Sequence, residues 1–228
     1  MLENLKVEVC NANLSLVENG LVMLTWGNVS CIDRATGLVV IKPSGVSYKE
    51  LVTEMMVVAD METGITLEGS LKPSSDMATH LELYRSFKTI GSIVHTHSTY
   101  ATIWAQALME ILVMGTTHAD TFYGSVPCTR PLTATEINPE YEAATGKVIV
   151  ETFSTLDPLR IPGVLVANHG PFTWGLTPDQ AVKNAIILEE IAKMALFTRL
   201  LGRTEPISRQ LLDKHFLRKH GDNAYYGQ

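Results

Sequence analysis

Residues 28–41 have the sequence NVSCIDRATGLVVI, and residues 55–69 have the sequence MMVVADMETGITLEG. In each stretch two apolar runs are joined by a short polar segment that contains a glycine, which is the pattern of a β-hairpin. Hairpins pair neighbouring strands in antiparallel fashion. These two stretches therefore predict a sheet with substantial antiparallel pairing.

Helical patterns and two further strands surround these hairpins. Apolar strands are predicted at residues 90–97 and 161–170, and the ambiguous segment 132–156 is interpreted as a helix. Helices are also predicted at residues 2–19, 75–87, 100–108, 177–201 and 208–220. Because strands and helices do not alternate strictly, we expect a single-domain three-layer α/β/α sandwich with a largely antiparallel mixed central sheet. One domain is expected over residues 1–228, with a C-terminal tail at 221–228 that completes a site.

Charge and composition limit the partners. The 228 residues include 18 Lys and Arg and 24 Asp and Glu, a net charge of −6, and basic blocks are lacking, so no nucleic-acid partner is expected. Only 18% of the residues are charged against a typical ~25%, which favours a homo-oligomer with apolar interfaces.

Three further sequence features indicate where the protein works. The first residues, MLENLKVEV, lack the apolar core of a secretory signal. The most apolar window, residues 182–201, contains five charged side chains, so no membrane span is expected. The three cysteines, Cys10, Cys31 and Cys128, form no CxxC pair, as is usual in a reducing cytoplasm.

The segment IVHTHS, residues 93–98, is the first candidate for chemistry. Strand side chains repeat every two residues, so His95 and His97 leave the same face and can bind one metal ion. His169 follows another apolar strand, and three imidazoles with one open position would form a catalytic zinc site. From the spacing alone a solvent-exposed strand end also explains one of these two histidines. The other histidines, His80, His118, His215 and His220, remain competing ligands.

Three turns rich in Gly and Ser are the second candidate for chemistry. They are TWGN at residues 25–28, KPSG at 42–45 and KPSSD at 72–76. Each can direct backbone N–H groups, hydroxyls and a lysine at an oxyanion, although each alone is also an ordinary turn. Candidates for acid and base are Asp76, His118, Asp120, Glu142, His215, Tyr225 and Tyr226.

Seven motifs are then considered together. TWGNVS, IKPSGV, KPSSD, IVHTHS, GTTHAD, ANHGPFTWG and the ending DKHFLRKHGDNAYYGQ resemble the L-ribulose-5-phosphate 4-epimerases, a family within the class II aldolase and adducin-like superfamily. The resemblance covers essentially the whole chain, and GTTHAD together with the ending is its most specific part. Thr121, Tyr100 and the proline-free segment 109–114 depart from the family pattern without touching a site residue.

The resemblance implies a complete site. It implies zinc bound by His95, His97 and His169, with Asp76 near or on the metal. It implies substrate phosphate bound by Gly27, Asn28, Ser44, Gly45, Ser74 and Ser75, with Lys42 compensating the charge. It also implies Asp120 and Tyr226 as the acid and base, with His215 orienting the chemistry at the tail.

The reaction that the resemblance implies interconverts L-ribulose 5-phosphate and D-xylulose 5-phosphate. The C4–H bond is not acidic, so inversion at C4 proceeds by retro-aldol cleavage of the C3–C4 bond, rotation of the aldehyde and re-addition. The family assembles as a homotetramer with sites between subunits, so Tyr226 is expected to complete the site of a neighbour, facing Asp120 across the substrate. A class II sugar-phosphate aldolase and a non-enzymatic adducin-like module are the alternatives, and arabinose and ascorbate degradation are both open as pathways.

Overall fold

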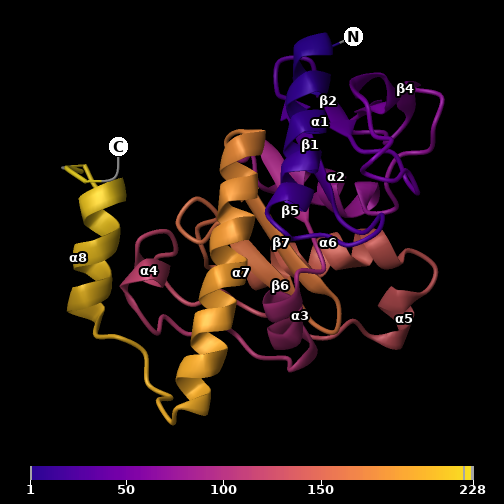
Figure 1. Cartoon of the computed structure of the whole chain (residues 1–228). Helices are drawn as coiled ribbons and strands as arrows, with labels where there is room; N and C mark the ends of the chain where they lie inside the picture. Colours follow the sequence, from indigo (N-terminus) through magenta and orange to yellow (C-terminus); the bar gives the residue numbers. More distant parts are fainter. Residues whose placement is uncertain (1, 223, 227–228) are drawn as a thin grey trace.

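A seven-stranded sheet forms the centre of the computed structural model, which describes residues 2–222 and 224–226. The strand order is β4-β3-β2-β1-β5-β7-β6 (Figure 1). The bounds are β1 (Asn28–Asp33), β2 (Leu38–Ile41), β3 (Val57–Asp60), β4 (Thr66–Glu68), β5 (Ser92–His95), β6 (Gly163–Val166) and β7 (Gly170–Gly175). The two predicted hairpins are confirmed as β1-β2 and β3-β4.

The sheet is more uniformly antiparallel than the mixed sheet expected from the sequence. All six strand pairings within the described residues are antiparallel. The one parallel pairing there is an isolated bridge between Cys128 and Leu165. Strands that follow one another along the chain are paired neighbours in β1-β2-β3-β4 and in β6-β7, and strands joined by such short connections pair in antiparallel fashion.

Helices cover both faces of the sheet, which confirms the three-layer α/β/α fold. Helices α1 and α7 lie over one face of the sheet, and α2 lies over the other face (Figure 1). Val29 and Val94 pack with α1 and α7, and the next residue along β1, Ser30, bonds to His80 of α2. The helix bounds are α1 (Glu3–Glu18), α2 (Met77–Ser86), α3 (Thr99–Gln106), α4 (Thr116–Ala119), α5 (Ala134–Ile137), α6 (Tyr141–Thr152), α7 (Pro178–Leu200) and α8 (Arg209–His220), with a 3₁₀ turn η1 (Thr53–Met55). Helix α8 stands at the side of the domain against α4 (Figure 1).

Local signals place most helix ends correctly. The Thr177 hydroxyl accepts a hydrogen bond from the Gln180 N–H and starts α7, and the Ser208 hydroxyl does the same for α8. The predicted helix at 132–156 is confirmed in two parts, α5 and α6. The break lies at Asn138-Pro139, while Gly146 continues inside α6.

Strand β7 is absent from the sequence-based prediction. Its sequence GPFTWG contains two glycines and a proline, which are poor strand formers. It is a strand because it pairs with both β5 and β6, and its six residues are buried. Within the described residues, no helix combines the length and apolar character needed to cross a bilayer.

Candidate active site

Three imidazoles converge where β5 and β6 end. His95 is the last residue of β5, His97 lies in the bend before α3, and His169 follows β6. One ring nitrogen from each lies within 4.8 Å of the others, and the Nε2 atoms of His95 and His97 are 3.1 Å apart. The turn between β6 and β7 is made before Gly170, which is the first residue of β7. Asn168 takes the left-handed conformation in this turn, with φ of 62°.

The protonation of these rings suits a metal ligand. His95 Nδ1 donates to the carbonyl oxygen of Pro171 at 3.0 Å, which leaves the lone pair of Nε2 directed at the cluster. Burial lowers the pKa of His95 and His97, and burial together with the two neighbouring imidazoles lowers the pKa of His169 to about 3. Neutral imidazole is the form that binds metal, so the set fits a divalent ion such as zinc.

Asp76 adds a negative charge beside the imidazoles. Its Oδ2 accepts a hydrogen bond from Asn28 Nδ2 at 2.7 Å. Burial by itself raises the pKa of this carboxyl, but the electrostatic interaction with the His95 and His80 rings and the hydrogen bond from the Asn28 amide outweigh burial and lower it. An ionised carboxylate beside three neutral imidazoles favours a cation between them. Asp76 is not part of the group whose ligand atoms converge.

A cavity of about 380 Å³ opens on this cluster. Every predicted metal and phosphate residue lines it. These residues are Gly27, Asn28, Lys42, Ser44, Gly45, Ser74, Ser75, Asp76, His95, His97 and His169. The cavity therefore brings together the candidate metal ligands and the candidate phosphate-binding turns, which are separate in the sequence.

Backbone hydrogen bonds bind the predicted turns to one another. Ser44 N–H donates to the Lys72 carbonyl at 2.9 Å, and Ser74 N–H donates to the Lys42 carbonyl at 3.0 Å. Asn28 Nδ2 donates to Ser74 Oγ at 2.9 Å, which attaches the 25–28 turn. We call these segments, residues 25–28, 42–46 and 72–75, the cradle.

Lys42 is a buried cation in the cavity wall. Its residue is 2% exposed, and burial lowers its pKa. Nζ donates to the carbonyls of Val46 at 3.0 Å and Pro43 at 3.3 Å. An ammonium carries three donors, so one is left over. Among the ion pairs of the described residues, none joins Lys42 to a carboxylate.

The predicted acid and base lie in a second cluster. Asp120 Oδ1 accepts from His215 Nδ1 at 2.9 Å and from Arg218 Nη2 at 3.1 Å, and Lys219 Nζ is 3.1 Å from Oδ2. Burial raises the pKa of Asp120, but the hydrogen bonds from His215, Lys219 and Arg218 outweigh burial and lower it. The Arg218 guanidinium lies 4.3 Å from the centre of the Tyr226 ring. Asp120, His215 and Tyr226 thus form one unit around α8, and none of the three lines the cavity.

The sequence does not point to Tyr141 as a cavity residue, and it presents Glu142 only as one of seven candidates for acid and base. Tyr141 and Glu142, at the start of α6, line the cavity, and the Tyr141 hydroxyl is 3.4 Å from His169 Nδ1. No local signal marks either residue, because the packing of α6 against α2 brings them to the cavity.

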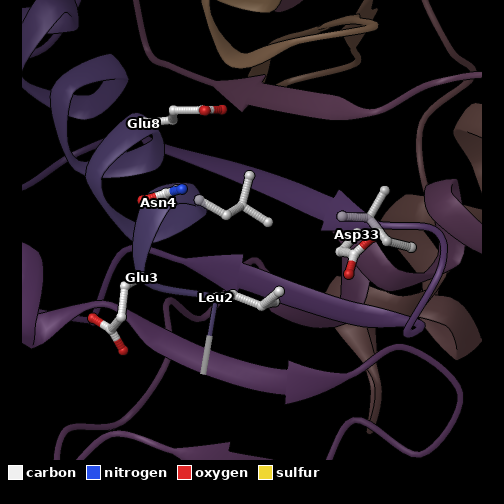
Figure 2. A pocket seen from close by; sticks show the side chains of 7 residues that line it. Leu2, Glu3, Asn4, Glu8 and Asp33 are labelled. Atoms are coloured by element: carbon white, nitrogen blue, oxygen red, sulfur yellow. The ribbon is translucent and has the colours of Figure 1, made fainter.

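A larger hollow beside α1 differs in chemistry. It measures about 490 Å³ and is lined by Leu2, Glu3, Asn4, Leu5, Glu8, Ile32 and Asp33 (Figure 2). Three acidic side chains and no cation or imidazole line it, so it would repel a phosphate. The competing histidines lie elsewhere: His80 contacts Ser30, and His118 bonds to the carbonyl of Gly124.

Comparison with known proteins identifies the class to which this fold and site belong. The profile of the class II aldolase and adducin N-terminal domain matches residues 7–196, and the chain belongs to this family. It is 54% identical over 228 residues to the L-ribulose-5-phosphate 4-epimerase UlaF of Salmonella paratyphi C and to that of Salmonella choleraesuis, covering 100% of both chains in each comparison. The resemblance seen in the seven motifs is confirmed.

Solved structures confirm the fold. An L-fuculose 1-phosphate aldolase superposes with a TM-score of 0.79 at 27% identity, over 93% of this chain and 94% of the other. YgbL of Escherichia coli, described as a putative aldolase/epimerase/decarboxylase, gives 0.74 at 25% identity, over 93% and 97%.

Proposed function

We propose that this chain is a zinc-dependent L-ribulose-5-phosphate 4-epimerase that interconverts L-ribulose 5-phosphate and D-xylulose 5-phosphate. The observation that carries the proposal is the single cavity in which three convergent imidazoles share a wall with a buried cation and the cradle. A sugar phosphate presents matching groups, hydroxyl and carbonyl oxygens at one end and a dianion at the other. The 54% identical relatives bear the name of this epimerase.

The phosphate end is supported by Lys42. A buried ammonium without a carboxylate partner is costly, and a bound phosphate supplies the missing negative charge. The spare N–H of Lys42, the hydroxyls of Ser44 and Ser74, and the Gly27 and Gly45 backbone offer it donors. Holding the phosphate keeps the aldehyde fragment in place while its carbonyl turns.

His95, His97 and His169 would bind zinc, with Asp76 beside it. Zinc bound there supplies Lewis-acid stabilisation of negative charge on the substrate oxygens. The Pro171 carbonyl fixes the His95 ring through Nδ1, and Phe172 stacks on it with ring centres 4.1 Å apart. A non-enzymatic adducin-like module has no use for three convergent imidazoles, which counts against that alternative.

Two proton transfers remain, and Asp120 and Tyr226 are proposed to perform them. One group removes the proton from the C4 hydroxyl and the other protonates the re-formed alkoxide. Both contact Arg218 of their own chain, at a place outside the cavity wall. We therefore propose that they enter the cavity of a neighbouring subunit together, with His215, in a homotetramer. This division differs from the one expected from the sequence, in which Asp120 and Tyr226 face each other from different subunits.

The catalytic test is an assay of zinc-loaded protein with L-ribulose 5-phosphate. Formation of D-xylulose 5-phosphate without free glycolaldehyde phosphate is expected. Release of glycolaldehyde phosphate as the main product would assign a class II aldolase instead, and turnover of neither kind would refute the proposal.

A cytoplasmic location is part of the proposal, and the three free thiols are compatible with it.

Subunit mixing tests the shared site. Inactive His97→Asn subunits, with an intact tail, are combined with inactive Tyr226→Phe subunits, with an intact cavity. Random mixing in equal amounts joins an intact cavity to an intact tail at about a quarter of the sites, so about a quarter of the activity returns. Mixtures of Asp120→Asn with Tyr226→Phe subunits should stay inactive. Recovery in both mixtures would place Asp120 with the cavity, and recovery in neither would refute a site shared between subunits.

A further inference from the structure

Tyr48 is a buried tyrosine beside the cradle that the proposed chemistry leaves unused. It lies between β2 and η1, is 7% exposed and does not line the cavity. Its hydroxyl is 3.0 Å from the carbonyl oxygen of Trp26 and 2.9 Å from that of Gly27. The phenol thus donates to the backbone of the 25–28 turn from behind.

The ring of Tyr48 contacts the second part of the cradle. Lys42 Nζ lies 4.8 Å from the ring centre, within the range of a cation–π contact. The same ammonium holds the Val46 carbonyl, and the Lys42 carbonyl accepts the N–H of Ser74. The Tyr48 side chain therefore links the 25–28 turn to Lys42. Lys42 in turn contacts Val46 of its own segment and Ser74 of segment 72–75.

The hydroxyl bonds also set the direction of a backbone donor. In a trans peptide unit the C=O and N–H groups point in opposite directions. Because the Trp26 carbonyl points at Tyr48, the Gly27 N–H points away from Tyr48, and Gly27 lines the cavity. The turn has little freedom on its other side, since a Cβ on Gly27 would lie 2.9 Å from the His95 carbonyl oxygen.

We propose that Tyr48 is a positioning residue for the phosphate cradle. The Tyr48 hydroxyl fixes the position of the 25–28 turn relative to Lys42, so that the donors for an oxyanion are in place before substrate arrives. This inference rests on the proposed function for the identity of the substrate. The arrangement of the cradle itself does not depend on it. Preformed donors lower the cost of ordering the site on binding.

Tyr48→Phe removes the hydroxyl and keeps the ring over Lys42. Loss of one shared hydrogen bond and of the turn's alignment should raise KM for L-ribulose 5-phosphate about tenfold, with kcat within about twofold of the wild type. Zinc content should be unchanged. Tyr84→Phe is the matched control, because the Tyr84 hydroxyl is also buried and bonds to Ser30 Oγ at 2.7 Å, away from the cradle.

Two further measurements separate positioning from a general loss of packing. Calorimetry with inorganic phosphate should show the same roughly tenfold weakening in Tyr48→Phe and none in Tyr84→Phe. Incorporation of 4-aminophenylalanine at position 48 restores a donor and should restore KM. The phosphate measurement stands even if the wild type proves to have no epimerase activity. Unchanged phosphate affinity in Tyr48→Phe, an equal loss in Tyr84→Phe, or failure of the amino analogue to rescue KM would overturn the inference.

Discussion

Replacing Lys42 by Met isolates the charge in the cavity wall. Methionine keeps much of the length and the apolar stem of the side chain and removes the ammonium. In the folded protein that ammonium is 2% exposed, donates to the carbonyls of Val46 and Pro43, and pairs with no carboxylate among the described residues. The substitution therefore changes substrate binding and stability by different amounts.

The loss in binding is estimated from the charge. Two unit charges about 4 Å apart interact by about 4 kcal/mol at an effective dielectric constant of about 20. The cavity is open to water and the phosphate must shed its hydration, so about half of this, about 2 kcal/mol, is expected to remain. Lys42→Met should therefore raise KM for L-ribulose 5-phosphate about 30-fold.

The stability effect should be small because two contributions oppose each other. The variant loses two hydrogen bonds but no longer buries a charge, so the free energy of unfolding should change by less than about 1.5 kcal/mol. Burial lowers the pKa of Lys42, so the folded wild type binds fewer protons than the unfolded chain between the folded pKa and the ordinary value of about 10.4. Wild-type stability should rise across that alkaline range, and the variant should lack this contribution.

Steady-state kinetics and urea unfolding at several pH values test both estimates. Tyr123→Phe is a suitable comparison, since its hydroxyl bonds to Asp213 far along the chain from the cradle. Unchanged KM in Lys42→Met, with a stable fold, would remove Lys42 from the phosphate site. The outcome that would refute the view that the unpaired ammonium lowers the stability of the fold has two parts. Lys42→Met would lose much of its free energy of unfolding, and that free energy would still rise with alkaline pH as steeply as in the wild type.

Three further outcomes are expected. His97→Asn should lower zinc affinity by at least about tenfold, measured as zinc content after dialysis, and full zinc content would contradict the assignment. Gly170→Ala should lower the free energy of unfolding by about 2 kcal/mol, because its Cβ would lie 2.7 Å from the Thr96 carbonyl oxygen; urea denaturation checks this, and an unchanged midpoint would show that β7 can shift freely. Asp120→Asn should lower stability by about 1 to 2 kcal/mol at neutral pH, because the lowered pKa of Asp120 stabilises the fold above the unfolded value of about 3.9. That difference should disappear as pH falls through the folded pKa, and a difference that persists in acid would point to packing instead.

Local patterns in the sequence are sufficient for several parts of this protein. The hairpins of residues 28–41 and 55–69, and the starts of α7 at Thr177 and α8 at Ser208, depend on hydrogen bonds and turns between near neighbours. The His95–His97 pair is also a local feature, although His97 lies beyond the end of β5 and converges through the bend that follows it.

The cavity and the division of the catalytic groups depend on contacts that are distant in sequence. Strand β7 exists because it pairs with β5 about 80 residues earlier, and this pairing overrides its own weak strand propensity. Tyr141 reaches the cavity only because α6 packs on α2. The sequence names Asp120 and Tyr226 as a pair but does not locate them, because packing of α8 against α4 places both on Arg218 and away from the imidazoles. Periodicity and turn chemistry act over a few residues, whereas a site is assembled by burying segments against one another, and only the tertiary structure specifies that burial.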